Sequence, residues 1–172
     1  MANFDVLFPV ILKVEGGYCN DPDDAGGATN KGIIFSEFKA WRRAQGKPTP
    51  TIADLKALTD NEAKAIYKAK YWDRWRADEI HSQKVANIVV DWTINSGSHG
   101  ITKPQALLGV KADGIVGAKT LAAINAANPD AFFEQVYNAR VAFYNSIVAR
   151  KPSQKKFLKG WLNRLKTIAK SC

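Results

Sequence analysis

Apolar residues recur every three or four positions along most of the chain, which is the spacing of one face of an α-helix. The pattern predicts a mostly α fold, and its first clear segment runs from Phe4 to Val14. Pro9 lies inside this segment, so the helix is expected to begin near Phe8 or to bend there. Further helices are predicted at residues 34–44, 51–58, 60–71, 82–96, 100–109, 117–125, 129–150 and 154–170.

Local signals support two of these helix starts. Thr59 and Glu62 have the spacing of a capping box, and Pro129 suits the first turn of the helix that follows it. The segment 82–96 is apolar on nearly all sides, which predicts the buried central helix of the fold.

Asp91 and Asn95 lie four residues apart and therefore share a face of that central helix. If both are buried, hydrogen bonds to neighbouring backbone would satisfy them, which is a purely structural role. The functional alternative places Asn95, near the helix end, on a substrate or on a reacting water.

Residues 14–33 interrupt the helical pattern. They contain five of the twelve glycines and four acidic residues, in a chain whose 25 Lys and Arg outnumber its 16 Asp and Glu. Glycine, proline, Asn and Asp favour turns, so we expect a small β-hairpin or turned loop after the first helix. No strand pattern occurs elsewhere in the sequence.

Glu15 stands at the end of the first predicted helix, where the negative end of the helix dipole disfavours an acidic side chain. That negative end and burial both favour a protonated carboxyl group, which is what a general acid needs. Asp24 adds a second carboxylate and Thr29 a hydroxyl, a set that suits a glycosidase. The alternative is a polar surface loop with a cation site, although the EF-hand spacing is not met.

The same segment resembles the signature of the family 108 glycoside hydrolases, the phage endolysins and secretion-associated N-acetylmuramidases of Gram-negative bacteria. The matching residues are Glu15-Gly16-Gly17-Tyr18, Asn20-Asp21-Pro22, Asp24, Gly26-Gly27, Thr29 and Gly32-Ile33. Further matches follow in the family's order at Asp91, Asn95-Ser96-Gly97, Asp113-Gly114-Ile115-Val116-Gly117, Gly160-Trp161 and Arg164. Cys19 and Ala25 are small departures from the pattern.

This resemblance implies a lysozyme-like helical fold that cuts the β-1,4 bond after N-acetylmuramic acid in peptidoglycan, with Glu15 as the catalytic acid. Asp24 would position water or stabilise positive charge on the sugar, and Thr29 would orient that water. Tyr18, Asn20, Asn95 and Asp91 are the substrate-binding candidates in the groove.

An aromatic cluster at residues 67–75 has two interpretations. Aromatic side chains supply much of the buried area of a small core, and this interpretation is favoured. The alternative is stacking against sugar rings, for which Tyr71 and Trp75 are the candidates.

The chain is expected to comprise a lysozyme-like catalytic part at residues 1–100 and a C-terminal helical part at 101–172, packed as one compact unit. The pattern of Asp113, Gly114, Gly117 and Thr120 resembles peptidoglycan-binding modules. The alternative is a loop-to-helix junction with a turn at Asp113 and Gly114.

A formal net charge of +9 favours polyanionic partners. Peptidoglycan carries carboxylates and is the expected partner, and no nucleic-acid recognition motif or membrane-spanning run is present. The spacing of the two His and two Cys predicts no metal site, and we expect no cofactor and a monomer. The start of the sequence lacks signal-peptide features, which predicts synthesis in the cytoplasm and action on the periplasmic wall after holin-type or other release.

Three other functions compete with the muramidase. A nucleic-acid binder would use only the basic surface, and the sequence shows neither a recognition motif nor basic–aromatic interleaving at residues 15–33 to support it. A lytic transglycosylase would use one glutamate and form an anhydro sugar without water, so that Asp24 and Thr29 would be dispensable. A non-catalytic wall-binding or secretion-accessory protein would bind peptidoglycan without cleaving it.

Overall fold

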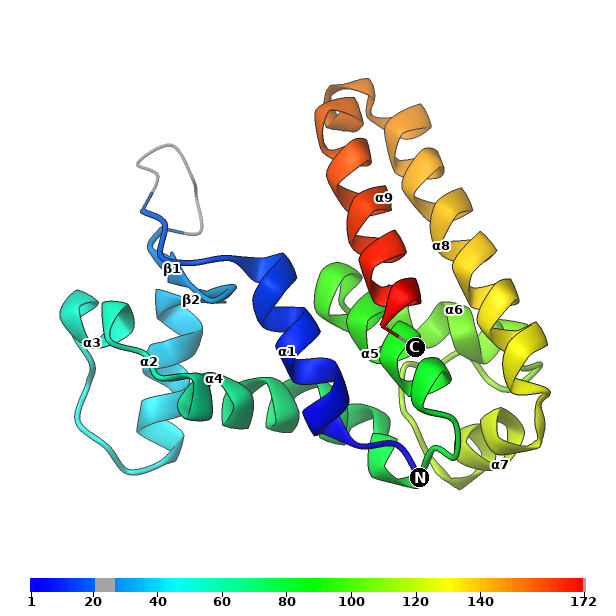
Figure 1. The fold of residues 1–172 in the computed structure, drawn as a ribbon, viewed down its shortest axis with the longest axis horizontal. Coiled ribbons are helices and arrows are strands. Elements are labelled where there is room, and N and C mark those ends of the chain that lie inside the picture. Colours follow the sequence, from blue (N-terminus) through cyan, green and yellow to red (C-terminus); the bar gives the residue numbers. More distant parts are fainter. Residues whose placement is uncertain (21–26, 172) are drawn as a thin grey trace. The chain divides into compact units, whose positions relative to one another are not determined.

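A computed structural model describes residues 1–20 and 27–171 of the chain. The described part is mostly α-helical with one small antiparallel hairpin, as predicted (Figure 1). None of its helices combines the length and apolar character needed to cross a membrane. The helices are α1 (Phe4–Glu15), α2 (Phe35–Ala44), α3 (Ile52–Lys56), α4 (Asp60–Tyr67), α5 (Gln83–Ser96), α6 (His99–Leu107), α7 (Ala118–Ala126), α8 (Pro129–Arg150) and α9 (Lys155–Lys170).

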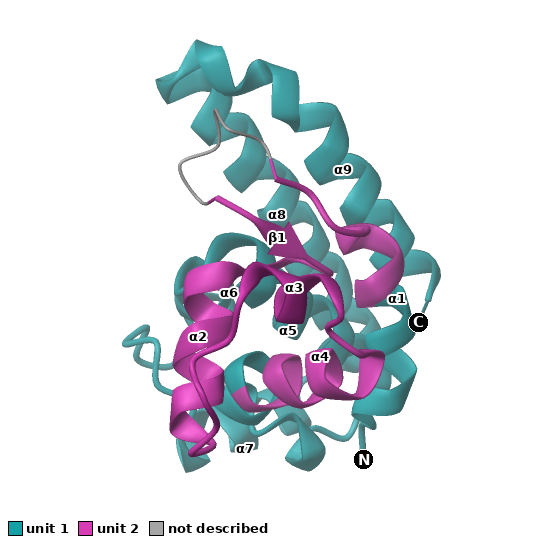
Figure 2. Cartoon of the chain, turned by 90° about the vertical axis from the view of Figure 1, so that its left-hand side faces the viewer, with its two compact units in different colours: residues 1–10, 70–172 teal, residues 11–69 magenta. Residues whose placement is uncertain are grey.

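The chain divides into two compact units, coloured separately in Figure 2. Unit 1 comprises residues 1–10 and 70–172, and unit 2 comprises residues 11–69. Helix α1 begins in unit 1 and ends in unit 2, and the expected boundary at residue 100 stays a prediction.

Unit 1 is built around α5, which contacts α6, α8 and α9. Every side chain from Val85 to Thr93 is buried, which confirms the predicted central helix. The start of the chain is tied to this unit, since the Ala2 amide donates to the Ile80 carbonyl at 2.8 Å.

Unit 2 contains the hairpin of β1 (Thr29–Asn30) and β2 (Ile33–Ile34). The two turn residues, Lys31 and Gly32, have φ of 51° and 76°. Positive φ at both positions is the conformation of a tight two-residue turn, and glycine tolerates it best. The Asn30 amide donates to the Leu55 carbonyl at 2.8 Å and so fastens the hairpin to α3.

Both ends of α4 differ from the sequence prediction. Thr59 accepts from the Glu62 amide at 3.2 Å, as a capping residue should, but the Glu62 carboxylate pairs with Arg42 of α2 at 2.7 Å. The predicted capping box is therefore only half correct.

The helix after it is also shorter than predicted. Helix α4 ends at Tyr67 and is followed by a π-helical turn, η1 (Lys68–Trp72), and then by the 3-10 turns η2 (Asp73–Trp75) and η3 (Ala77–Glu79). A further 3-10 turn, η4 (Pro152–Gln154), joins α8 to α9.

Candidate active site

Glu15 is the last residue of α1, as predicted, and its side chain is half-buried. Gly16 follows with φ of 77°, the left-handed conformation that commonly ends a helix. The Gly16 amide still donates to the Leu12 carbonyl at 3.3 Å, which closes the last turn. The carboxyl group thus stands where the helix stops and the glycine-rich segment begins.

The glycine-rich segment is closed at its base by two backbone hydrogen bonds between Cys19 and Thr29, of 2.9 and 2.8 Å. These bonds place Thr29 at the first residue of β1, with its side chain half-buried. Asp24 lies outside the described residues, so its role stays a prediction.

Tyr18 and Asn20 flank this base on the surface of unit 2. Tyr18 is 37% exposed, and the Lys56 ammonium lies 4.9 Å from its ring centroid. Asn20 is also exposed. Both side chains are accessible, as substrate-binding residues must be, and their role stays a prediction.

The turn of the hairpin lies directly against Glu15. A Cβ atom added at Gly32 would come within 2.6 Å of Glu15 Oε2 and still closer to the hydroxyl oxygen of Tyr67. That hydroxyl donates to the Lys31 carbonyl at 2.9 Å. Helix α1, the hairpin and α4 therefore meet at this point, and only glycine leaves room for the carboxyl group.

Sequence patterns did not identify Tyr67 as part of this site. Only a weak signal could have identified Tyr67. A phenylalanine would pack as well at this helix position, so the choice of tyrosine indicates a buried hydroxyl group that needs a hydrogen-bond partner. The resulting arrangement holds a partly accessible carboxyl group at a fixed place, which suits proton transfer to a bound molecule.

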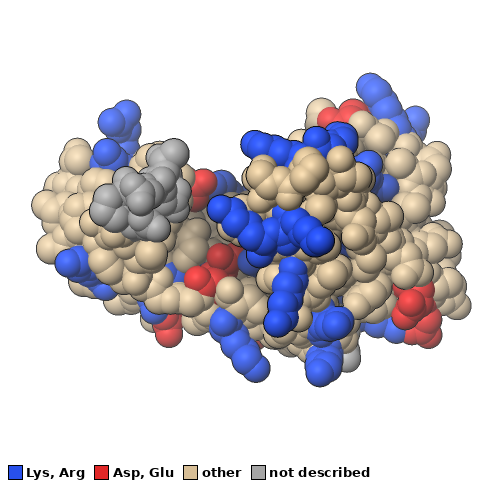
Figure 3. Space-filling view, turned by 90° about the horizontal axis from the view of Figure 1, so that it is seen from above, with Lys and Arg blue, Asp and Glu red and all other residues tan. Residues whose placement is uncertain are grey.

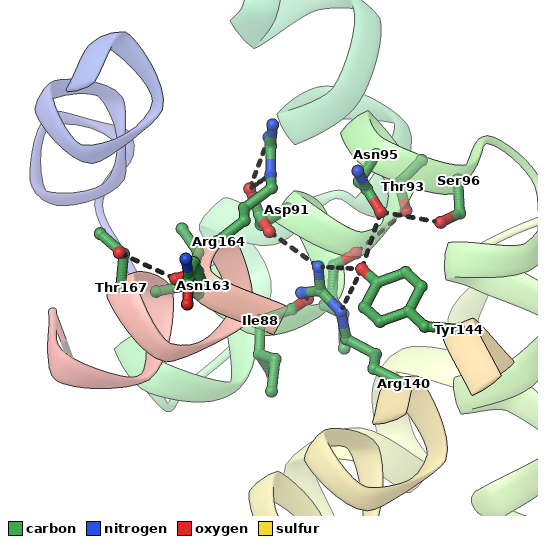
Figure 4. Close-up of polar contacts among 12 residues, drawn as sticks. Ile88, Asp91, Thr93, Asn95, Ser96, Arg140, Tyr144, Asn163, Arg164 and Thr167 are labelled. Carbon is green, nitrogen blue, oxygen red and sulfur yellow. Dashed lines mark hydrogen bonds and ion pairs between the residues drawn. The ribbon is translucent and has the colours of Figure 1, made fainter. Parts of the chain in front are cut away.

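Unit 1 holds a buried ionic group that we call the Asp91 cluster, comprising Asp91, Arg140, Tyr144 and Arg164 (Figure 4). Arg140 donates to Asp91 Oδ2 at 2.9 Å and Arg164 to Asp91 Oδ1 at 2.8 Å. Burial raises the pKa of Asp91, but the guanidinium groups of Arg164 and Arg140 more than offset this and hold it below its usual value. Asp91 is fully buried, so we remove it from the substrate-binding set. Its partners are arginines and not the neighbouring backbone expected above.

The Asp91 cluster continues through Tyr144 to Asn95. Arg140 donates to the Tyr144 hydroxyl at 2.9 Å, and that hydroxyl donates to Asn95 Oδ1 at 2.7 Å. Burial raises the pKa of the Tyr144 phenol more than Arg140 lowers it, so the hydroxyl keeps the proton that it donates. Asn95 itself is half-buried and lines a pocket of unit 1, and its role in the substrate groove stays a prediction.

The two aromatic groove candidates differ. Trp75 is fully buried and its indole nitrogen donates to Thr93 Oγ1 at 2.8 Å. It belongs to the core, and we remove it from the substrate-binding set. Tyr71 is half-buried with the Lys70 ammonium 5.2 Å from its ring centroid, and its role stays a prediction.

The loop at residues 113–115 is held by hydrogen bonds to one buried side chain, that of Gln105. The side-chain amide nitrogen of Gln105 donates to the Ile115 carbonyl at 2.9 Å, and its side-chain oxygen accepts from the backbone amide of Gly114 at 2.9 Å. Asp113 Oδ1 in turn accepts from the Ile115 amide, a bond that lowers the pKa of Asp113. The interpretation as a loop-to-helix junction therefore accounts for these residues without a ligand.

Among the described residues, no group of three or more His, Cys, Asp or Glu side chains is placed to hold an ion. The acidic residues of the predicted cation-site alternative at 21–24 lie outside the described residues. Cys19 is exposed and carries no disulfide.

Comparisons with known proteins identify the family of the chain. The model of the family Glycosyl hydrolase 108 matches residues 8–97, and a Predicted Peptidoglycan domain matches residues 99–166. No curated protein matches the chain, whereas eleven chains among solved structures do.

One of these structures, that of Brucella abortus SagA, is 32% identical to this chain and superposes with a TM-score of 0.79. The match covers 98% of this chain and 92% of SagA. The residues that carry the resemblance, from Glu15 to Ile33, fall inside the family match. The chain therefore belongs to the glycosyl hydrolase 108 family, and it carries a peptidoglycan domain after the hydrolase region.

Proposed function

We propose that the protein is an N-acetylmuramidase, which hydrolyses the β-1,4 bond between N-acetylmuramic acid and N-acetylglucosamine in peptidoglycan. The observation that carries the proposal is the position of Glu15, half-buried at a helix end and packed against Gly32. In this role the Glu15 carboxyl protonates the leaving glycosidic oxygen. The hydrolase family and the peptidoglycan domain support the choice of substrate.

Asp24 supplies the second carboxylate of the proposed reaction. It acts either as the base that activates water or as the group that stabilises positive charge on the sugar, and Thr29 orients the water. The anomeric configuration of the first product, read by proton NMR, separates these roles. Inversion assigns Asp24 to the base, and retention assigns it to the stabilising or nucleophilic group.

The proposal is tested by digesting purified peptidoglycan with the wild type and with Glu15→Gln, and identifying the new sugar ends by mass spectrometry. We expect reducing muramic acid ends, released at least about 100-fold more slowly by the variant. The matched control is Glu134→Gln, which removes the same charge from an exposed position on α8 and should cleave like the wild type.

Other outcomes assign the protein to other classes. Anhydro ends would make it a lytic transglycosylase, and reducing glucosamine ends a glucosaminidase. Peptidoglycan binding without any cleavage by folded wild type would leave the wall-binding function in place of the enzyme.

The proposed site of action is the periplasmic wall. We expect expression in the cytoplasm of a Gram-negative host to be tolerated, and expression with an added export signal to lyse the cells. Glu15→Gln with the same signal should not lyse them. Lysis by both forms would show that wall cleavage through Glu15 is not its cause.

A further inference from the structure

We propose that a pocket in unit 1 binds the free carboxylate of a peptidoglycan stem peptide; the choice of ligand rests on the proposed function. The pocket has a volume of about 310 Å³ and lies where the end of α5 meets α6, α8 and α9. Its polar lining includes Asn95, Ser96 and Arg150. None of the described residues that line it is an Asp or Glu.

Hydrogen bonding fixes the orientation of Asn95. Arginine has donors only, so the Tyr144 hydroxyl accepts from Arg140 and must give its own proton to the next group, Asn95. The acceptor oxygen of the Asn95 amide therefore faces Tyr144, and Ser96 Oγ donates to the same oxygen at 3.1 Å.

The amide nitrogen of Asn95 is consequently directed away from Tyr144 (Figure 4). No acceptor for it occurs among the residues that the structure describes, although Asn95 is half-buried and lines the pocket. Two N–H donors held in place by the buried Asp91 cluster are thus available to an oxygen of a bound molecule.

Aromatic rings form one wall of the pocket. Tyr144 and Trp161 lie with ring centroids 5.5 Å apart, and Phe157, which is not among the lining residues, stacks on Trp161 at 6.1 Å. Such a wall suits the apolar part of a ligand, for example the methyl groups of alanine residues in a peptide.

Basic side chains lie at or near the pocket. Arg150 is one of the lining residues, and its Nε donates to the Ser146 carbonyl at 3.3 Å. The Lys103 ammonium lies 5.7 Å from the ring centroid of Phe143, another lining residue. Residues 150–172 contain eight of the 25 Lys and Arg and none of the 16 Asp and Glu. In Figure 3, which looks onto the end where α8 meets α9, Lys and Arg side chains cover more of the surface than Asp and Glu side chains do.

Two of these basic residues lie where their charge does not stabilise the helix. Lys155 and Lys156 begin α9 at its positive end, where cationic side chains are unfavourable. Basic residues placed against the helix dipole point to an anionic partner.

These features select a carboxylate over a neutral sugar. The aromatic wall suits a sugar ring as well as an apolar side chain, but a neutral sugar gains nothing from the positive charge of Arg150. A carboxylate accepts from both Asn95 and Arg150, and bonds to an ionised group are stronger than neutral ones. In peptidoglycan, free carboxylates next to small apolar side chains occur in the stem peptides attached to muramic acid.

The test is an NMR titration of ¹⁵N-labelled wild type with N-acetylmuramyl-L-alanyl-D-isoglutamine, which has one sugar and one free carboxylate. We expect amide shifts at residues 95–99, 143–150 and 161. The methyl ester of the same compound, which lacks the charge, should bind about tenfold more weakly. Equal binding of acid and ester, or shifts confined to other residues, would overturn the proposal.

Two variants sharpen the test. Arg150→Ala should weaken binding of the acid about tenfold and leave the ester unaffected, whereas Arg74→Ala removes the same charge from an exposed position of unit 1 and should change neither. Asn95→Asp keeps the acceptor for Tyr144 but replaces the donors by a negative charge, so it should abolish binding of the acid. Unchanged binding in both pocket variants contradicts the proposed contacts.

The probe contains a single sugar, so its binding does not depend on cleavage. Binding that requires Arg150, combined with no cleavage of peptidoglycan, contradicts the proposed reaction alone. Cleavage that requires Glu15, combined with no binding of the probe, contradicts this inference alone.

Discussion

Asp91 of unit 1 and Glu15 of unit 2 lie in contrasting environments. In unit 1, Asp91 is fully buried and both of its oxygens accept from arginines. In unit 2, Glu15 is half-buried at the end of a helix, beside a turn in which a Cβ atom at Gly32 would clash with its carboxyl group. A fully paired carboxylate stabilises a fold, whereas a proton donor has to remain open to its substrate. Changes in the Asp91 cluster should therefore act mainly on stability, and changes around Glu15 mainly on activity.

The largest effect is expected from Asp91→Asn. The substitution leaves the buried guanidinium of Arg140 and the nearly buried one of Arg164 without their counter-ion. Removing one partner of a buried ion pair costs about 3–5 kcal/mol, and urea unfolding at neutral pH measures the loss in free energy of unfolding.

A surface pair provides the control for this prediction. Asp130 pairs with Lys84 but is 78% exposed, so Asp130→Asn should cost no more than about 1 kcal/mol. Equal losses in the two variants would remove the proposed difference between the Asp91 cluster and an ordinary ion pair.

Gly32→Ala should show the opposite behaviour, with activity as the main loss. A Cβ atom there displaces Glu15 or Tyr67, and a misplacement of about 1 Å costs roughly 100-fold in rate. The positive φ adds about 1 kcal/mol of strain. Rates of peptidoglycan cleavage and urea unfolding separate the two effects.

Gly46→Ala is the matched control, because Gly46 also has a positive φ, of 66°, but its Cβ would meet nothing within 4 Å. It should carry a similar strain and keep full activity. If both alanine variants cleave at the same rate, the close packing of Gly32 against Glu15 has no catalytic importance.

The helices could be predicted from the sequence because their signals are local. For α8, the apolar spacing, Pro129 in the first turn and the capping side chain of Asn128 all agree, and the predicted range matches the structure. The predicted capping box at the start of α4 was only half correct, because the Glu62 side chain pairs with Arg42, twenty residues away in the sequence.

The same distinction applies to the candidate site. Glu15 was identifiable because a helical pattern ends at a pair of glycines. Its neighbours Gly32 and Tyr67 come from a turn and from another helix, and no local pattern brings these segments together. Asp91 and Arg140 are 49 residues apart, so the sequence indicated a polar residue in the core but not its partner.

Tyr67→Phe should give a smaller effect than Gly32→Ala. It removes the hydrogen bond to the Lys31 carbonyl, which costs about 1 kcal/mol of stability and loosens the turn beside Glu15. We expect peptidoglycan cleavage to fall about tenfold. Tyr137→Phe, which deletes a hydroxyl from a half-buried tyrosine of α8, should leave the rate unchanged; equal rates in both variants would contradict a role for the Tyr67 hydroxyl.

The smallest effect is a dependence on pH. Because the pKa of Asp91 is lower in the folded protein than in the unfolded chain, its ionisation stabilises the fold above the unfolded value of about 3.9. This contribution is lost as the pH falls through the folded pKa. The difference in unfolding free energy between wild type and Asp91→Asn should therefore stay constant from about pH 5 to 8 and narrow below about pH 4. Urea midpoints at constant ionic strength measure it. A difference that stays constant at acid pH would mean that Asp91 acts through shape and hydrogen bonding, and that its charge is not what stabilises unit 1.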